Sequence, residues 1–302
     1  MKKKIGIPKA LLYHRYYPAW KKFFTELGLE VITSVDSNEK IMGQGSKLAS
    51  NEVCVPVKLF LGHADYLKDK VDYLFVPRLV SVKDNEYICP KFMGLPDVVE
   101  YTNNDLPELI SPVINIRDKS LSLFKSAYQI GQKFDKGLIK VSKAFFAAAK
   151  KLRKYKKQQV KDFWHSDKEK IVLIGHEYIL YDKYMSMDLI DKLEKMGAEV
   201  ITPRQLGEDN IEAEIKDKFN NIFWTFGRKM MEAGEYFTNH QKIDGIIQLT
   251  AFGCGPDSLI GEILERKGKS KKPFMTLNLD EHTGEAGLVT RVEAFLDMVR
   301  RD

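Results

Sequence analysis

The chain alternates short apolar runs with longer segments of mixed apolar and charged residues. The runs at Val71–Pro77 and Ile243–Leu249 are almost continuously apolar, which is typical of parallel strands buried on both faces. Further strands are expected at Lys4–Pro8, Lys170–Ile174 and Pro273–Leu279. Helical segments of about 15 residues separate these runs, and this alternation predicts an α/β fold built from βαβ units.

The pattern occurs twice along the chain. Residues 11–33 read LLYHRYYPAWKKFFTELGLEVIT and resemble residues 179–202, ILYDKYMSMDLIDKLEKMGAEVIT, with one residue of slippage. In each copy a strand leads through a loop into a helix, and Gly28 or Gly197 lies where that helix should end. We therefore predict two doubly wound, Rossmann-like domains of similar construction.

A helical segment is expected to join the two domains. Residues 116–165 contain no proline and are rich in Lys, Ala, Leu and Phe, so we predict domains at 1–115 and 166–302 with this connector between them. Basic residues gather within 133–161. We interpret them as the solvated face of an amphipathic helix, with a patch for an acidic partner, a nucleotide-like ligand or nucleic acid as the alternative.

Composition narrows the class of protein. The 302 residues are 44% hydrophobic with a net charge of +6, and no apolar run approaches the roughly 20 residues that cross a bilayer. The first residues do not form a signal peptide, since a proline interrupts a short apolar stretch. A cytoplasmic protein is expected, with no membrane or nucleic-acid partner, and a dimer is left open.

The three cysteines are the first candidate ligands. A proline follows each one within two residues, as Cys54-Val55-Pro56, Cys89-Pro90 and Cys254-Gly255-Pro256. Proline makes such a loop rigid, and Gly253 and Gly255 let the backbone approach a bulky group. Thiolates select iron–sulfur clusters, zinc or copper(I). No C-x-x-C pattern is present, so the spacing alone also allows three unrelated thiols.

Other candidates follow predicted strands. His14 and Arg15 lie in the first βα turn, where they could bind a phosphate or donate a proton, or simply form a packed polar loop. Glu281 and His282 follow the last strand and could serve as acid–base groups, with His282 also a candidate fourth ligand. The alternative is a loop in which Asp280 or Thr283 caps the final helix.

Several common catalytic motifs are absent from the sequence. It has no G-x-x-x-x-G-K-[ST] loop, no G-x-G-x-x-G after a strand and no G-x-S-x-G elbow. The chain therefore has no recognisable ATP site of its own, and any ATP-driven step would need another protein.

Five blocks resemble a known family. They are Ile5–Tyr13, the segment around Cys54, Glu86–Phe92, Thr250–Ser258 and Leu277–Gly287. Together they are similar to the acyl-CoA dehydratase activase-related family, which itself resembles the subunits of 2-hydroxyacyl-CoA dehydratases and the double-cubane cluster reductases. The resemblance spans nearly the whole chain.

This resemblance implies a site and a partner. It implies an iron–sulfur cluster between two Rossmann-like domains, bound by Cys54, Cys89 and Cys254, in an anaerobic setting. It also implies an ATP-hydrolysing activase that supplies a low-potential electron; in the dehydratases this electron reduces the thioester carbonyl to a ketyl radical, from which the hydroxyl leaves. Three cysteines favour one [4Fe–4S] cluster over a double cubane.

Around such a cluster we expect a second set of residues. Lys58, Pro90, Gly253 and Gly255 would shape its surroundings, and Arg15 and Lys58 would favour a negative cluster or an anionic ligand. The sequence then leaves three hypotheses: a redox enzyme acting on an acyl-CoA or other small molecule at an open iron, a non-catalytic electron carrier, and a zinc-stabilised interaction domain with His282 or Asp257 as fourth ligand.

Overall fold

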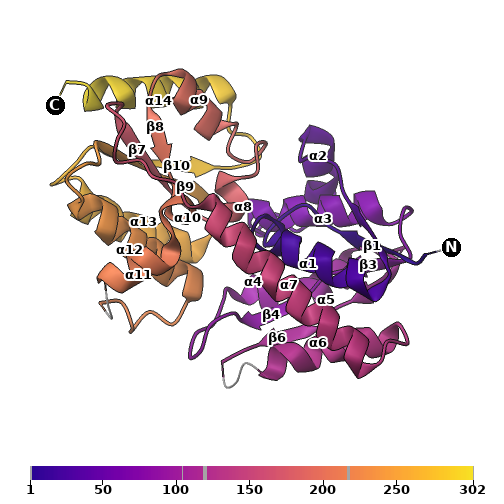
Figure 1. The fold of residues 1–302 in the computed structure, drawn as a ribbon. Helices are drawn as coiled ribbons and strands as arrows, with labels where there is room; N and C mark the ends of the chain where they lie inside the picture. Colours follow the sequence, from indigo (N-terminus) through magenta and orange to yellow (C-terminus); the bar gives the residue numbers. More distant parts are fainter. Residues whose placement is uncertain (1, 104, 118–120, 216–217, 302) are drawn as a thin grey trace. The chain divides into compact units, whose positions relative to one another are not determined.

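The computed structural model describes residues 2–103, 105–117, 121–215 and 218–301. The chain forms two compact units. The first comprises Met1–Tyr155 together with Phe223–Thr225, and the second comprises Lys156–Ile222 together with Phe226–Asp302. Each unit has its own parallel sheet (Figure 1).

The first unit is built on a four-stranded parallel sheet in the order β2-β1-β3-β5. Its strands are β1 (Lys4–Ile7), β2 (Glu30–Thr33), β3 (Tyr73–Phe75) and β5 (Glu108–Ile110). Two further strands, β4 (Arg78–Ser81) and β6 (Val113–Asn115), follow β3 and β5 along the chain. They pair with each other as a separate parallel sheet.

The second unit is built on a four-stranded parallel sheet in the order β8-β7-β9-β10. Its strands are β7 (Lys170–Ile174), β8 (Glu199–Ile201), β9 (Gly245–Ala251) and β10 (Phe274–Leu279). Every residue of the central strands β7 and β9 is buried, as the apolar runs in the sequence predict for strands covered on both faces.

The two sheets have the same strand order. In each, the second strand in the chain lies at one edge, the first strand is next to it, and the third and fourth follow on the other side. This order belongs to the doubly wound class, so the predicted Rossmann-like α/β fold is confirmed. The two similar segments, 11–33 and 179–202, also end their helices in the same way, because Gly28 and Gly197 both have a positive φ, 93° and 97°.

Seven helices are described in the first unit. They are α1 (Tyr13–Leu27), α2 (Glu39–Leu48), α3 (Val55–Leu67), α4 (Pro90–Met93), α5 (Leu95–Thr102), α6 (Leu121–Lys133) and α7 (Leu138–Gln159). One face of the sheet is covered by α1, α6 and α7, whose side chains share a core with the strands. The end of α3 approaches β1, where Leu67 lies close to Gly6.

The helical segment predicted as a connector contains α6 and α7. Ile130, Val141 and Ala144 from these helices are buried in one core with Ile5 and Phe24. Up to Tyr155, therefore, this segment belongs to the first unit. Its apolar stripe packs on the sheet and its many lysines lie on the other side, as expected of an amphipathic helix.

The helices of the second unit cover both faces of its sheet. They are α8 (Glu177–Leu180), α9 (Leu189–Lys195), α10 (Pro203–Leu206), α11 (Glu208–Ile215), α12 (Thr225–Asn239), α13 (Gly255–Gly268) and α14 (Glu285–Val299). Figure 1 shows α9 and α14 on one face and α11, α12 and α13 on the other. Ile171 and Leu173 of β7 are buried in the core beneath α9 and α14, and Val172 and Ile174 in the core beneath α11, α12 and α13. None of the helices in the described ranges is long and apolar enough to span a bilayer.

Candidate functional site

All three cysteines occupy the same local position. Cys54, Cys89 and Cys254 are the N-cap residues of α3, α4 and α13, and each helix has a proline in its first turn. Proline is favoured there because the first helical N–H groups have no partner within the helix. Each thiol is partly buried and none forms a disulfide. The cysteine–proline spacing in the sequence therefore encodes one repeated geometry.

Cys54 lies between two helices that pack at unusually close range. A Cβ atom added at Gly45 of α2 would lie 1.8 Å from the carbonyl oxygen of Lys58 in α3. One added at Gly62 of α3 would lie 2.0 Å from the carbonyl oxygen of Ile41. Only glycine permits this contact between backbones, and the contact fixes the loop that carries Cys54.

The surroundings of Cys54 act on its ionisation. Burial raises the pKa of the Cys54 thiol above its usual value, and the nearby Cys89 thiol raises it further, whereas the Val57 amide and the Lys91 ammonium lower it. Burial is the largest of these effects. The Cys54 and Cys89 thiols are thus electrostatic neighbours within the first unit, next to a positive charge.

Cys89 is held in place by a segment that comes from far along the sequence. Tyr87 donates its N–H to the carbonyl of Phe223 at 2.7 Å and accepts the N–H of Thr225 at 2.8 Å. The guanidinium of Arg117 lies 4.2 Å from the centre of the Tyr87 ring. These contacts explain why Phe223–Thr225 belongs to the first unit, and they fix the backbone just before Cys89.

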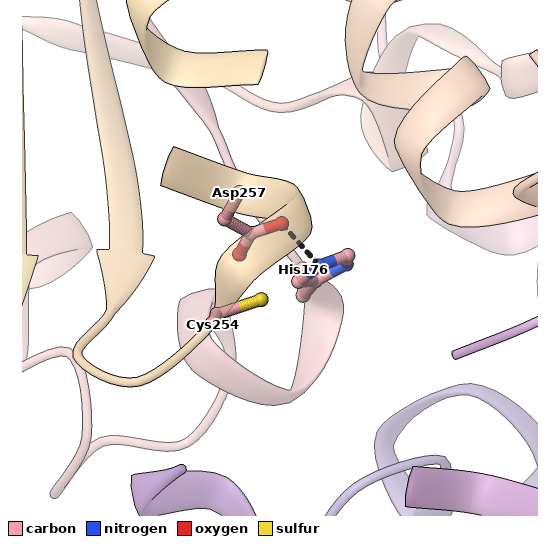
Figure 2. A group of neighbouring side chains, drawn as sticks. All are labelled: His176, Cys254 and Asp257. Carbon is pink, nitrogen blue, oxygen red and sulfur yellow. Dashed lines mark hydrogen bonds and ion pairs between the residues drawn. The ribbon is translucent and has the colours of Figure 1, made fainter. Parts of the chain in front are cut away.

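Cys254 lies next to two side chains of its own unit. The nearest nitrogen or oxygen ligand atoms of His176 and Asp257 and the sulfur of Cys254 all lie within 4.8 Å of one another. Figure 2 shows the imidazole, the carboxylate and the thiol directed toward one another. The Nε2 atom of His176 is 2.8 Å from Oδ1 of Asp257. Asp257 is only 1% exposed, and its Oδ2 atom is buried without a hydrogen-bond partner.

Neighbouring rings fix the orientation of His176. Its imidazole stacks on Tyr178 with ring centres 4.9 Å apart and meets the edge of Phe226 at 5.9 Å. The adjacent Glu177 forms an ion pair with Arg204, in which both side chains are largely buried. These contacts restrict the imidazole to a small range of positions beside Asp257.

His14 and Arg15 are helical, which corrects their expected place in a loop. Both lie in the first turn of α1, because the chain turns earlier, at Leu11, where φ is 51°. Arg15 is buried, with its guanidinium 5.7 Å from the centre of the Tyr16 ring, and His14 meets the edge of Tyr13. Lys58 is also buried, within α3.

Glu281 and His282 lie in the loop that follows β10. Asp280 accepts hydrogen bonds from the His282 N–H and the Thr283 hydroxyl, each at 2.8 Å, and the Thr283 hydrogen bond holds the pKa of the Asp280 carboxyl below its usual value. The loop thus stabilises itself. The N-cap of α14 is Gly284, with no side-chain cap, so the expected capping by Asp280 or Thr283 is wrong. Among the described residues, neither Glu281 nor His282 belongs to the group of ligand atoms around Cys254.

Comparison with known proteins identifies the family. Residues 4–206 match the family model described as the CoA enzyme activase uncharacterised domain. The chain belongs to this family. The match confirms the activase-related resemblance of the sequence blocks, and it covers both Cys54 and Cys89.

Other comparisons add little to this assignment. A comparison with curated proteins gives no match. Among solved structures, a ZnuA crystal structure is 8% identical with a TM-score of 0.29 and covers 99% of both chains. The Zn(II)-bound ZnuA-like domain of AdcA from Streptococcus pneumoniae is 11% identical with a TM-score of 0.30, covering 100% of this chain and 98% of that one. At such low scores, neither likeness bears on the fold or function of this family member.

The donor set of this CoA enzyme activase-related chain suits an iron–sulfur cluster. Such clusters are held by cysteine thiolates, and here three thiols share one rigid helix-start geometry. Gly253, with φ at 80°, and Gly255, where an added Cβ would meet nothing within 4 Å, leave the approach to Cys254 open. Pro90 begins the helix that follows Cys89.

Two further residues of this family member, His176 and Asp257, lie beside Cys254. His176 follows β7 just as His14 follows β1, so the rule that ligands gather at the carboxyl ends of strands could have selected it. Asp257 stands three residues after Cys254, in the first turn of α13, and the sequence suggests it only as a fourth ligand of a zinc ion. The pairing of His176 with Asp257, 81 residues apart, has no signal in the sequence.

Proposed function

We propose that the chain is an iron–sulfur protein of the 2-hydroxyacyl-CoA dehydratase type. In this proposal Cys54 and Cys89 of the first unit and Cys254 of the second hold one [4Fe–4S] cluster, and an ATP-hydrolysing activase supplies its electrons. When bound, the cluster would deliver a low-potential electron to a small-molecule substrate at an iron without a cysteine ligand. The observation that carries the proposal is the shared N-cap position of all three cysteines.

The protein groups near the cysteines are suited to a negative cofactor. Lys91 lies close enough to Cys54 to lower its pKa, and Lys58 is buried one turn further along α3. A buried positive charge favours an anionic group nearby. These residues would therefore stabilise the reduced, more negative state of a bound cluster.

The first unit also contains an apolar cavity that could hold the acyl group of a substrate. An apolar cavity of about 260 Å³ lies between the sheet and α1, α6 and α7, and Trp20, Phe75 and Leu79 are among its lining residues. The same three side chains line a second, smaller cavity that reaches Phe92, three residues after Cys89. Cavities of this size bind small apolar molecules, so the acyl chain of a CoA ester is the substrate that we propose.

Metal analysis of cysteine variants tests the cluster. Anaerobically purified or reconstituted protein should contain about four iron and four sulfide ions per chain. Cys54→Ala, Cys89→Ala and Cys254→Ala should each lose most of this iron, because each removes one of three thiolates. Ser258→Ala is the matched control, since Ser258 lies in the first turn of α13 and its hydroxyl donates a hydrogen bond to the Cys254 backbone carbonyl, not to the thiol. Native iron and sulfide in all three cysteine variants would refute the proposal.

The electron paramagnetic resonance spectrum of the reduced protein separates an enzyme from an electron carrier. If one iron lacks a protein ligand, added cyanide or a small thiol should change the spectrum. A spectrum that no added ligand changes would indicate a closed site and favour the electron-carrier function.

A further inference from the structure

The carboxyl ends of β7 and β9 form the point where the second sheet changes winding direction. These strands are adjacent, and the chain leaves them toward opposite neighbours, β8 and β10. In open α/β sheets this is the position where ligands bind. His176 follows β7 by two residues, and Cys254 follows β9 by three. Asp257 projects from the first turn of α13 into the same place (Figure 2).

The buried carboxylate of Asp257 is incompletely satisfied. One oxygen pairs with His176, but the other is buried with no hydrogen-bond partner, although the side chain is 99% removed from solvent. A buried carboxylate oxygen without a partner is unfavourable, and a cation bound at that oxygen would compensate it. The orphaned oxygen thus indicates a positively charged ligand at this position.

The three donors match the preferences of one class of metal. They offer one imidazole nitrogen, one sulfur and one carboxylate oxygen, which are the ligand types of zinc and related transition metals. Bonds of about 2.0–2.3 Å place two ligands of one tetrahedral ion about 3.5 Å apart. Here the ligand atoms lie within 4.8 Å of one another, so small side-chain rotations bring all three to one ion.

We propose that His176, Cys254 and Asp257 bind a single divalent transition-metal ion, such as Zn²⁺ or Fe²⁺. The fourth position of the ion stays open to water or to an oxygen or sulfur atom of a small ligand, as in zinc sites with three protein ligands. Every ligand comes from the second unit, so this site needs neither Cys54 nor Cys89. Cys254 serves both sites, and the ion is therefore expected in chains that lack cluster iron.

Titration of reduced, metal-free protein with Co²⁺ and Zn²⁺ tests the site. The wild type should bind one Co²⁺ per chain with a sulfur-to-cobalt charge-transfer band, and Zn²⁺ should displace it. The double variant Cys54→Ala/Cys89→Ala should keep this band and the wild-type affinity. His176→Gln and Asp257→Asn, which preserve side-chain size, should each weaken binding at least tenfold. His240→Ala, which removes an imidazole that stacks on Trp164, should have no effect.

The outcomes separate this site from the proposed cluster. Loss of the cobalt band in the folded Cys54→Ala/Cys89→Ala variant, or unchanged affinity in a folded His176→Gln or Asp257→Asn variant, would overturn the metal site. A wild type that never acquires iron and sulfide would instead refute only the cluster. Circular dichroism of each variant before titration distinguishes lost ligands from lost folding, and the two conservative variants keep the test valid if one of them unfolds.

Discussion

The two units have sheets with the same strand order, yet the equivalent point of each sheet carries different chemistry. In the second unit the ends of β7 and β9 carry His176 and Cys254. In the first unit the ends of β1 and β3 lead into Pro8 and Pro77, and the space beside them is a small cavity lined by apolar side chains such as Leu12 and Phe60.

The cysteines of the first unit do not directly follow β1 or β3 along the chain. Cys54 begins the helix that crosses from β2 to β3, and Cys89 follows the additional strand β4. The same topology therefore does not dictate the same site. The first unit has apolar residues at the position where the second has potential metal ligands.

The largest effect is expected for Gly45→Ala. The new methyl group would lie 1.8 Å from the Lys58 carbonyl oxygen, so α2 and α3 must separate. We expect a loss of about 3 kcal/mol in the free energy of unfolding, the upper end for overpacked sites, measured by urea denaturation. Cluster iron should fall as well, because Cys54 begins α3, whereas Co²⁺ binding in the second unit should persist.

Gly43→Ala is the control for this variant. Gly43 is an exposed glycine of the same helix, and an added Cβ would meet nothing within 4 Å. Alanine there should leave stability unchanged or raise it by about 0.5–1 kcal/mol. Equal losses for the two variants would show that the α2–α3 contact does not position Cys54.

A smaller, matched effect is expected for Gly28→Ala and Gly197→Ala. Both glycines end a helix with a left-handed backbone, and the next residue, Leu29 or Ala198, closes the turn with the same backbone hydrogen bond. Alanine in this conformation costs about 1–2 kcal/mol. Thermal unfolding should therefore shift by similar amounts in both variants. A clear difference between the two variants would show that the two similar segments, 11–33 and 179–202, do not depend on their glycines to the same extent.

The sequence reveals these features unequally. The strand runs and the two glycine caps are predictable because their signals are local and occur twice. The helix-start position of the cysteines is also predictable, since a proline follows each of them within two residues. The α2–α3 crossing is not, because Gly45 matters only through a backbone 13 residues away at Lys58.

Contacts between residues far apart in the sequence account for the features that the sequence does not predict. Phe223–Thr225 joins the first unit through backbone hydrogen bonds to Tyr87 and through ring contacts of Phe223 and Trp224 with Tyr87. Asp257 comes close to His176 only because β7 and β9 pair side by side. No local pattern encodes either contact, so Cys254 and Asp257 could be proposed as ligands from the sequence, but their grouping with His176 could not.

The most direct test of the central claim is a count of reactive cysteines by alkylation and mass spectrometry, before and after anaerobic reconstitution with iron and sulfide. We predict that Cys54, Cys89 and Cys254 all react in the metal-free protein and that all three become protected together as the cluster forms. Protection of Cys54 and Cys89 while Cys254 remains fully reactive, or no protection at all, would contradict a single cluster held by the three cysteines.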